Sequence, residues 1–405
     1  MPRTAEKPAI WLIVMIALIP QLSEAIYTPA LPEIAETLKT SIPLTEHTLA
    51  IYLLGFAFGV FLWGTRADAI GRRPAVLLGY TLFSIACVGC YFSKSIEALL
   101  AWRFVQGLGG AVGSVMGQTI ARDSFKGKER GVVFSTVGMV LTLGPALGPV
   151  VGGVIVQNFH WSMVFIVLLF AGFFVLFNVS ARLPETHPDF NNRHNRIRWY
   201  TAAAQMIKDP QVVTCGSVVG GIVGIGFSLY SEGPFYFIDI LNLSPSQYGF
   251  IFPLICTAAI LGGFVSRHLN KKGRTPIELI HASIIVLLVS TVLMTLSTYM
   301  GLISIASPTQ SIVLSIGFLF FINFAFGLSI PNALSLALMK YGHMAGTAGA
   351  LFGFYYYMVT AVIAYGMGLF HDGALSAMPL YFMIVTGMCL GLFMLNKKKL
   401  EHDHD

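Results

Sequence analysis

The sequence predicts an all-α integral membrane protein with twelve transmembrane helices. Hydrophobic residues make up 55% of the 405 residues and charged residues only 11%, whereas a soluble domain carries about 25% charged residues. Apolar runs of about 20 residues, long enough to span a hydrocarbon core about 30 Å thick, recur along the whole chain. Strands of a membrane barrel would be about 10 residues long with alternating polarity, so these runs indicate helices.

Each apolar run is interpreted as one helix. In chain order, the predicted helices cover residues 9–30, 47–65, 75–93, 97–120, 131–156, 162–181, 211–236, 247–267, 277–300, 309–338, 345–370 and 376–395.

The longest polar connection follows the sixth run and is rich in Arg, His, Asn and Pro. It divides the chain into a predicted N-terminal six-helix bundle at 1–183, a cytoplasmic linker at 184–210 and a C-terminal six-helix bundle at 211–405. Such a layout is typical of transporters built from two repeats, with the substrate site between them.

The basic residues predict the orientation. If the chain starts inside and alternates, all but three of the 25 Lys and Arg residues fall on the inner side, the exceptions being Lys39, Lys94 and Arg103. This distribution obeys the positive-inside rule and predicts cytoplasmic termini for a multi-pass protein of the bacterial inner membrane. The net charge of +6 is therefore assigned to contact with the lipid bilayer, and no nucleic-acid partner is expected.

The fifth run contains glycines at every fourth position and two prolines between them. Small residues at this spacing let another helix approach at backbone distance, and prolines bend a helix that the bilayer otherwise keeps hydrogen-bonded. The run therefore predicts a hinge or a tight seal between two moving bodies. Its residues are Gly144, Pro145, Gly148, Pro149 and Gly152.

The connection between the second and third runs carries a second motif. Asp68 is expected at the start of a helix from the other half, where the helix dipole favours an anion, and is expected to pair with Arg72. Asp123, which ends the fourth run, is expected to take a second arginine of the loop. The alternative is a plain topological anchor. The residues of this predicted cytoplasmic latch are Gly64, Asp68, Gly71, Arg72, Arg73 and Asp123.

Two acids, Glu24 and Glu232, are interpreted as the only carboxylates clearly inside the spans. Membrane carboxylates are rare and commonly functional, so both are predicted to bind and release a proton in exchange for substrate. Arg103 is expected beside the proton-carrying acid, where its charge favours deprotonation. The alternatives are structural or solvent-wetted acids, and an arginine that extends to the outer surface.

Polar and aromatic residues of several spans are candidates for the substrate cavity, with simple packing as the alternative for any one of them. These candidates are Tyr27, Tyr52, Gln118, Tyr230, Tyr236, Asn323, Asn332, Tyr355 and Tyr356. Most histidines are assigned to loops, and no metal site is expected. No glycine–lysine phosphate loop occurs in the sequence, so no cofactor is expected and the proton gradient is the predicted energy source.

Together these motifs resemble the twelve-span drug:proton antiporters of the major facilitator superfamily, and among them the bicyclomycin- and chloramphenicol-type exporters. The likeness is carried by the run from Gly138 to Gly153, the loop from Gly64 to Pro74 and the fourth-run segment around Arg103. The family often has an aspartate two residues before the tyrosine of the first span; here Ala25 occupies that position, and the acid is Glu24. The resemblance implies the major facilitator fold, in which two six-helix bundles surround a central cavity.

The sequence and the resemblance predict a proton-coupled antiporter that exports small amphiphilic organic compounds or drugs. The expected partners are a small-molecule substrate, protons and the bilayer, and a monomer suffices because one chain encloses its own pathway. An enzyme is not expected, because no nucleophile–base set is found in the spans. The alternatives are a dedicated exporter of one endogenous metabolite such as a siderophore, an importer or uniporter, and a membrane sensor without transport.

Overall fold

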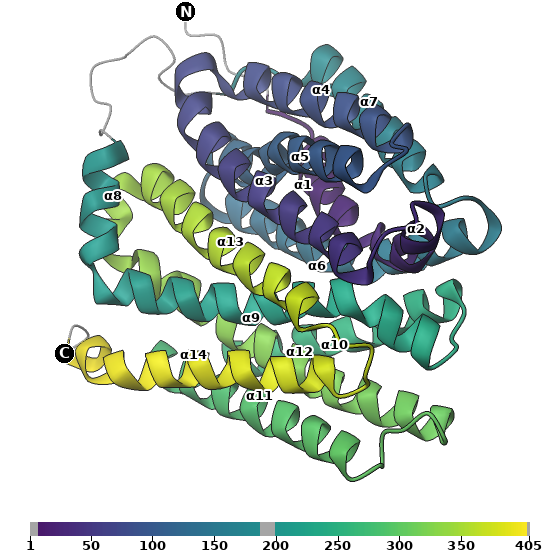
Figure 1. Cartoon of the computed structure of the whole chain (residues 1–405). Coiled ribbons are helices and arrows are strands. Elements are labelled where there is room, and N and C mark those ends of the chain that lie inside the picture. The colour runs from purple at the N-terminus through teal and green to yellow at the C-terminus, as the bar shows by residue number, and fades with distance from the viewer. Residues whose placement is uncertain (1–6, 187–198, 403–405) are drawn as a thin grey trace, which may run out of the picture.

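The computed structural model describes residues 7–186 and 199–402, and these residues form helices joined by short connections (Figure 1). The N-terminal half contains α1 (Ile10–Ala25), the short η1 (Thr28–Ala30) and α2 (Leu31–Thr37), then α3 (Ile42–Ile70), α4 (Arg72–Tyr91), α5 (Ile96–Ser124), α6 (Gly127–Asn158) and α7 (Met163–Arg182). The C-terminal half contains α8 (Trp199–Lys208), α9 (Pro210–Pro234), the π-helical η2 (Phe235–Ile240), α10 (Pro245–Lys271), α11 (Pro276–Tyr299), α12 (Pro308–Leu338), η3 (Met339–Met344), α13 (Ala345–Phe370) and α14 (Ala377–His402).

Proline and capping residues set many of the helix starts in the C-terminal half. Pro245 and Pro276 occupy the first turns of α10 and α11, where the missing N–H costs no hydrogen bond. The residues before them, Ser244 and Thr275, close full capping boxes with Gln247 and Glu278. These local signals start each helix at the membrane boundary without help from tertiary contacts.

Eleven segments of the described chain are long and apolar enough to cross a membrane. The twelfth predicted span is α5, whose 29 residues extend over roughly 43 Å at about 1.5 Å per residue. It falls outside the apolar set because it carries Arg103, Gln106 and several glycines. It is nevertheless enclosed by α1, α3 and α4, so the prediction of an all-α membrane protein is confirmed.

Two hydrophobic cores are present, one formed mainly by α1–α7 and the other by α8–α14. Figure 1 shows the two groups of helices stacked one above the other. The halves meet chiefly where α3 packs on α13 and α6 packs on α10. Residues 187–198 of the predicted linker lie outside the described residues, and its C-terminal part forms the helix α8.

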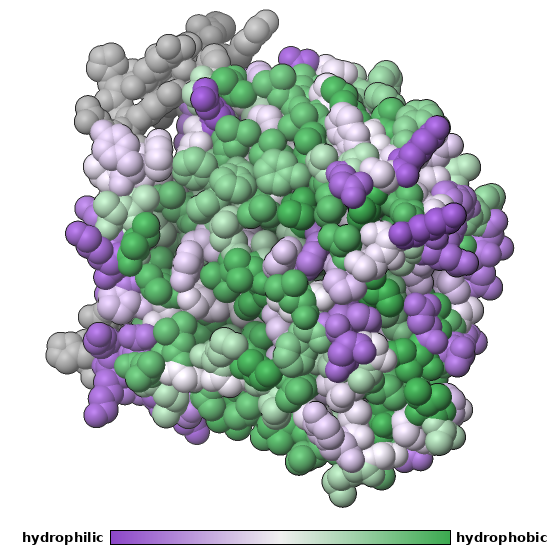
Figure 2. Space-filling view, viewed as in Figure 1, coloured by the Kyte–Doolittle hydropathy of each residue, from purple (hydrophilic) through white to green (hydrophobic). Residues whose placement is uncertain are grey.

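The surface is apolar around the middle of the molecule. In Figure 2, hydrophilic residues gather mainly toward the two ends of the helices, with apolar residues between them. On α7, for example, Phe170, Phe173 and Phe177 are all more than half exposed. An apolar band this wide is expected where lipid replaces water, and the chain is a multi-pass membrane protein.

Candidate functional site

The two ends of the helix bundle are named here for reference. The terminal end carries the start of α1, the end of α14 and α8, and the distal end carries α2 and the α13–α14 connection (Figure 1). Glu24 near the end of α1 and Glu232 near the end of α9 both lie toward the distal end.

Arg103 is fully buried in α5. The glycines of α5 allow this burial, because a Cβ on Gly107 or Gly109 would collide with the backbones of α3 and α4. Neighbouring helices therefore approach α5 at backbone distance and enclose its side chains. The alternative that Arg103 extends to the outer surface is wrong.

The Arg103 guanidinium lies between two aromatic rings. Its central carbon is 4.3 Å from the centre of the Tyr27 ring and 4.2 Å from that of Tyr52. One terminal nitrogen donates to Gln106 Oε1 at 2.6 Å, while Nε and Nη2 have no hydrogen-bond partner among the described atoms. Cation–π contacts in a desolvated site contribute about 2 kcal/mol each, so the rings hold the charge while leaving two donors for another ligand.

Glu24 is 4% exposed, and its Oε1 has no hydrogen-bond partner in the described part of the chain. It lies close enough to Arg103 for their charges to interact. Tyr52 of α3 also lies near enough to Glu24 for the charge of Glu24 to affect it. A buried carboxyl group beside a buried cation can hold a proton or give it up with little rearrangement.

Aromatic residues of the C-terminal half face the same carboxyl group. Tyr230 of α9 and both Tyr356 and Tyr357 of α13 lie near enough to Glu24 for its charge to affect them. Tyr357 also packs on Phe56 of α3, with ring centres 4.7 Å apart. Glu24 therefore lies where the two halves meet, among tyrosines from both. The name Glu24 site is used below for Glu24, Arg103 and the tyrosines around them, which are Tyr27, Tyr52, Tyr230, Tyr356 and Tyr357.

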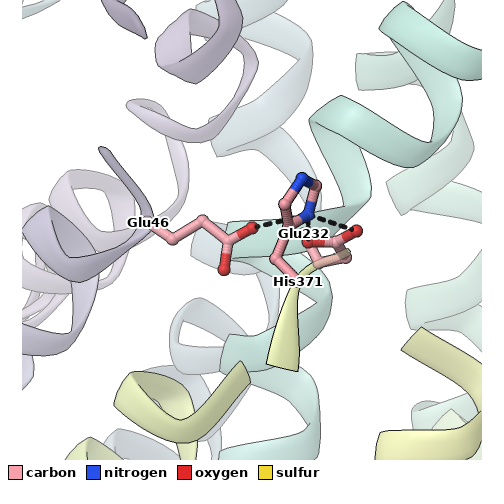
Figure 3. Close-up of side chains that lie close together, drawn as sticks. All are labelled: Glu46, Glu232 and His371. Atoms are coloured by element: carbon pink, nitrogen blue, oxygen red, sulfur yellow. Dashed lines mark hydrogen bonds and ion pairs between the residues drawn. The ribbon is translucent and has the colours of Figure 1, made fainter. Parts of the chain in front are cut away.

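Glu232 has different neighbours. Its carboxylate oxygens lie 2.8 and 3.1 Å from His371 Nδ1, and His371 Nδ1 also lies 3.7 Å from Glu46 Oε1 (Figure 3). Glu46 is contributed by α3, Glu232 by α9, and His371 directly follows α13. This set, called the distal cluster, joins the two halves of the protein. The predicted coupling role of Glu232 stays a prediction.

Glu46 corrects the prediction that only two acids lie inside the spans. It is fully buried, because α3 begins at Ile42 rather than near 47. The sequence does contain a signal for this earlier start, because proline is frequent in the first turn of a helix and Pro43 lies there. The following residue, His47, is also buried in α3 and stacks on Tyr365 at 3.9 Å between ring centres. Sequence reasoning missed His371 because only tertiary structure brings it to the two acids.

The other cavity candidates do not all gather at one place. Tyr355 hydrogen-bonds Ser217 at 2.7 Å, and Tyr236 hydrogen-bonds Ser315 at 2.8 Å within the C-terminal half. Gln118 is exposed.

Neither asparagine of α12 lies at the Glu24 site. Asn323 donates to the carbonyl of Leu319 one turn earlier in its own helix. Asn332 donates to Ser266 and accepts from Asn270, both on α10 near the terminal end. Both side chains therefore have structural partners.

The predicted latch residues form a network around Arg72. Its guanidinium lies 2.5 Å from Asp68 and 3.1 Å from Asp123, which links α3, α4 and α5. Asp123 thus pairs with Arg72 itself rather than with a second arginine of the loop. Arg73 instead donates to the carbonyl of Ser180 at 2.6 Å.

Three further residues contribute to this connection. Gly71 has a φ of 97°, a conformation that favours glycine. Glu185, to which no role was assigned from the sequence, accepts the backbone N–H groups of Arg72 and Arg73 at 2.9 and 3.2 Å. Gly64 lies about one helical turn before Asp68 in α3, and a Cβ there would meet the side chain of Ala350 on α13.

The predicted hinge or seal lies in α6, which remains one helix through Pro145 and Pro149. Its ridge of Gly144, Gly148 and Gly152 packs on Gln21, Ala25 and Ile26 at the end of α1. An adjacent face of α6 contacts the other half, because a Cβ on Gly249 of α10 would collide with the Pro149 carbonyl. The α6 helix therefore connects the segment that carries Glu24 to the C-terminal half.

Comparison with known proteins gives a consistent result. The family profile "Major Facilitator Superfamily" matches residues 13–365. An "Uncharacterized transporter" of Rickettsia bellii is 31% identical, covering 98% of this chain and 99% of its own length. The "Bicyclomycin resistance protein homolog" of Haemophilus influenzae is 29% identical over 86% of both chains. "Multidrug resistance protein D" of Escherichia coli is 27% identical over 84% of both.

The fold has a solved counterpart. The crystal structure of a "D-xylose-proton symporter" superposes with a TM-score of 0.74 at 14% identity, covering 94% of this chain and 96% of that one. The matched family and relatives are transporters rather than enzymes.

Proposed function

Because the chain belongs to the Major Facilitator Superfamily, we propose that it is a proton-coupled antiporter that exports small amphiphilic organic compounds. Export would run across the bacterial inner membrane, with both termini in the cytoplasm. The observation that carries this proposal is the Glu24 site, in which a buried carboxyl group lies beside the buried Arg103 and among tyrosines of both halves.

Proton and substrate would compete for this site. When Glu24 is protonated, Arg103 is held only by Gln106 and the two tyrosine rings. A substrate that approaches Glu24 would favour the ionised carboxylate and displace the proton. The aromatic surroundings suit amphiphilic molecules, since tyrosine offers both an apolar face and a hydroxyl group. One site that holds either the proton or the substrate gives exchange without a further coupling device.

Two relatives support the choice of substrate class, since their names associate them with bicyclomycin resistance and multidrug resistance. The motif of α6 supports antiport by resemblance. Alternating access would then move the halves about the α6–α10 and α3–α13 contacts; the Arg72 network links helices of the N-terminal half alone and would move with that half.

Transport into inverted membrane vesicles tests the proposal. With an imposed pH gradient, several phenicols and cationic dyes should each provoke proton release in vesicles carrying the wild type. Glu24→Gln should abolish this release, because glutamine keeps the shape of glutamate but cannot titrate. Glu36→Gln, at an exposed acid on α2, is the matched control and should behave as wild type.

Other outcomes would redirect the proposal. Release with only one metabolite of a wide panel would indicate a dedicated exporter. Release that survives in Glu24→Gln but disappears in Glu232→Gln would overturn the assignment of the proton to Glu24.

A further inference from the structure

The distal cluster has a composition that the transport proposal does not use. The three residues Glu46, Glu232 and His371 each offer a ligand atom, and these atoms all lie within 4.8 Å of one another. In Figure 3 the two carboxylates point toward the imidazole from opposite sides. They come from three separate segments of the chain.

Glu46 lacks the partners that a buried carboxylate normally has. It is 0% exposed, no described donor reaches its two oxygens, and it lies close enough to Glu232 for the two carboxyl groups to share a hydrogen bond when one of them is protonated. Its one ion-pair contact in the described structure is the 3.7 Å approach to His371. An unsatisfied buried carboxylate is costly, so both oxygens remain available to a ligand that enters the cluster.

Charge points to the kind of ligand. With both carboxylates ionised, as metal binding requires, the two acids and the imidazole carry a net negative charge even when the imidazole is protonated. Burying such a charge without compensation costs several kcal/mol. A cation bound among the three side chains would remove that cost, so the cluster is suited to a positive ion rather than to an anion or a neutral molecule.

We propose that Glu46, Glu232 and His371 form a binding site for a divalent transition-metal ion of the Zn²⁺ type. Zinc takes imidazole nitrogen and carboxylate oxygen at about 2.0–2.2 Å, which places tetrahedral ligand atoms roughly 3.4 Å apart. The distances of 2.8 and 3.7 Å from His371 Nδ1 lie on either side of this value. The imidazole favours Zn²⁺ over Mg²⁺ or Ca²⁺, which prefer oxygen ligands alone.

Gly368 and His47 lie directly beside the cluster, and His47 offers a candidate fourth ligand. Gly368 has no side chain to fill the space, and a Cβ there would lie 3.0 Å from His47 Nε2 and 3.2 Å from Glu46 Oε2. His47 Nε2 is buried and has no hydrogen-bond partner in the described structure. His371 is slightly exposed, with 8% of its side chain accessible. Of the three residues, His371 is therefore the one nearest to the solvent.

A bound ion would connect the two halves, since Glu46 belongs to one and Glu232 and His371 to the other. It would hold the distal end closed and so inhibit any cycle that opens it. The site is independent of the transport proposal, because metal binding is measured on purified protein without flux.

The test is calorimetric titration of the purified, tag-free full chain with Zn²⁺. One site of micromolar or tighter affinity is expected, weakened at least tenfold by Glu46→Gln and by His371→Gln. His160→Gln removes a half-exposed histidine at the same end and should leave the affinity unchanged. The double variant His402→Gln/His404→Gln checks the histidine- and acid-rich sequence at 401–405 and should also bind as wild type.

Equal affinity in the wild type and in both cluster variants would overturn the proposal, as would loss of the site in the 401–405 variant. Zinc X-ray absorption of the wild type gives a second measurement that does not depend on a variant folding. It should show only nitrogen and oxygen ligands near 2.0–2.1 Å. A sulfur ligand would contradict the proposed site.

Discussion

At the scale of single residues, the Glu24 site depends on a charge that the protein buries completely. Arg103 lies between Tyr27 and Tyr52, and its two unpartnered nitrogens face no other described acceptor. Because no direct ion pair joins Arg103 and Glu24 in the described structure, the cation acts on Glu24 through its electric field. Such an arrangement changes the proton affinity of the carboxyl group without restraining its position.

Replacing Arg103 should change the pH dependence of substrate binding. Without the positive charge, Glu24 would hold its proton to higher pH, and the pH of half-maximal substrate binding should rise by about one unit or more in Arg103→Gln. Arg103→Lys keeps the charge but loses the planar stacking on the tyrosines, so its midpoint should stay nearer to that of the wild type. Ligand titrations across pH would measure both. Equal midpoints in all three proteins would contradict the role of Arg103.

At the scale of helices, glycine positions decide which segments can approach one another. The α6 ridge packs so closely on α1 that a Cβ on Gly152 would collide with the carbonyl of Ile26. Gly131, at the other end of the same helix, has no atom within 4 Å of the position of such a Cβ. Alanine substitutions at these two positions therefore separate the effect of the close helix contact from the effect of helix propensity.

Gly152→Ala should destabilise the protein by about 1–3 kcal/mol, the usual cost of overpacking a close contact. Gly131→Ala should be neutral or slightly stabilising, because alanine is the better helix former. Thermal unfolding of the purified variants measures the difference. If both alanines behave alike, the close contact between α1 and α6 does not exist in solution.

The Arg72 network gives a second prediction for helices. Arg72 and Asp123 are 7% and 11% exposed in their side chains, and they join α4 to α5. Arg72→Gln should cost about 3–5 kcal/mol, as expected when a buried pair loses one partner. Arg122→Gln removes a 41% exposed arginine 3.8 Å from the same acid and should cost no more than about 1 kcal/mol. Denaturation of both variants in the same detergent would compare them, and similar losses would argue against the network.

At the scale of the whole molecule, the halves meet at the distal end through α6 and α10. The backbone N–H of Ser246 donates to Gln157 Oε1 at 3.3 Å, and Gly153 lies against the carbonyl of Pro245. Alternating access requires these contacts to separate once in every cycle.

Cross-linking tests that requirement. A short bis-methanethiosulfonate, which forms a disulfide with each cysteine, should join the halves in Gln157→Cys/Ser246→Cys and reduce substrate flux to below about a tenth of its starting value. A reducing agent should restore the flux, and the two single variants serve as controls. Undiminished flux through fully cross-linked protein would show that the distal contact does not open.

Sequence reasoning predicted the membrane fold well, because each span is a long apolar run that needs no tertiary information. It failed where the site depended on the position of a helix start or on a contact between residues far apart in the sequence. The start of α3 was placed after Glu46, which hid a buried acid despite the signal of Pro43. His371 was assigned to a loop, and only folding brings it to Glu232. The placing of Tyr356 near Glu24 likewise depends on how the halves meet.

The most direct test of the account is proton release from purified protein in weakly buffered solution when a substrate binds. The wild type should release about one proton per bound molecule near the pH at which Glu24 is half protonated. Glu24→Gln should bind the substrate at every pH only as weakly as the protonated wild type does, and should release no proton even at saturating substrate, whereas Glu36→Gln should match the wild type. Undiminished release from a folded Glu24→Gln protein would contradict the claim that proton and substrate exchange at Glu24.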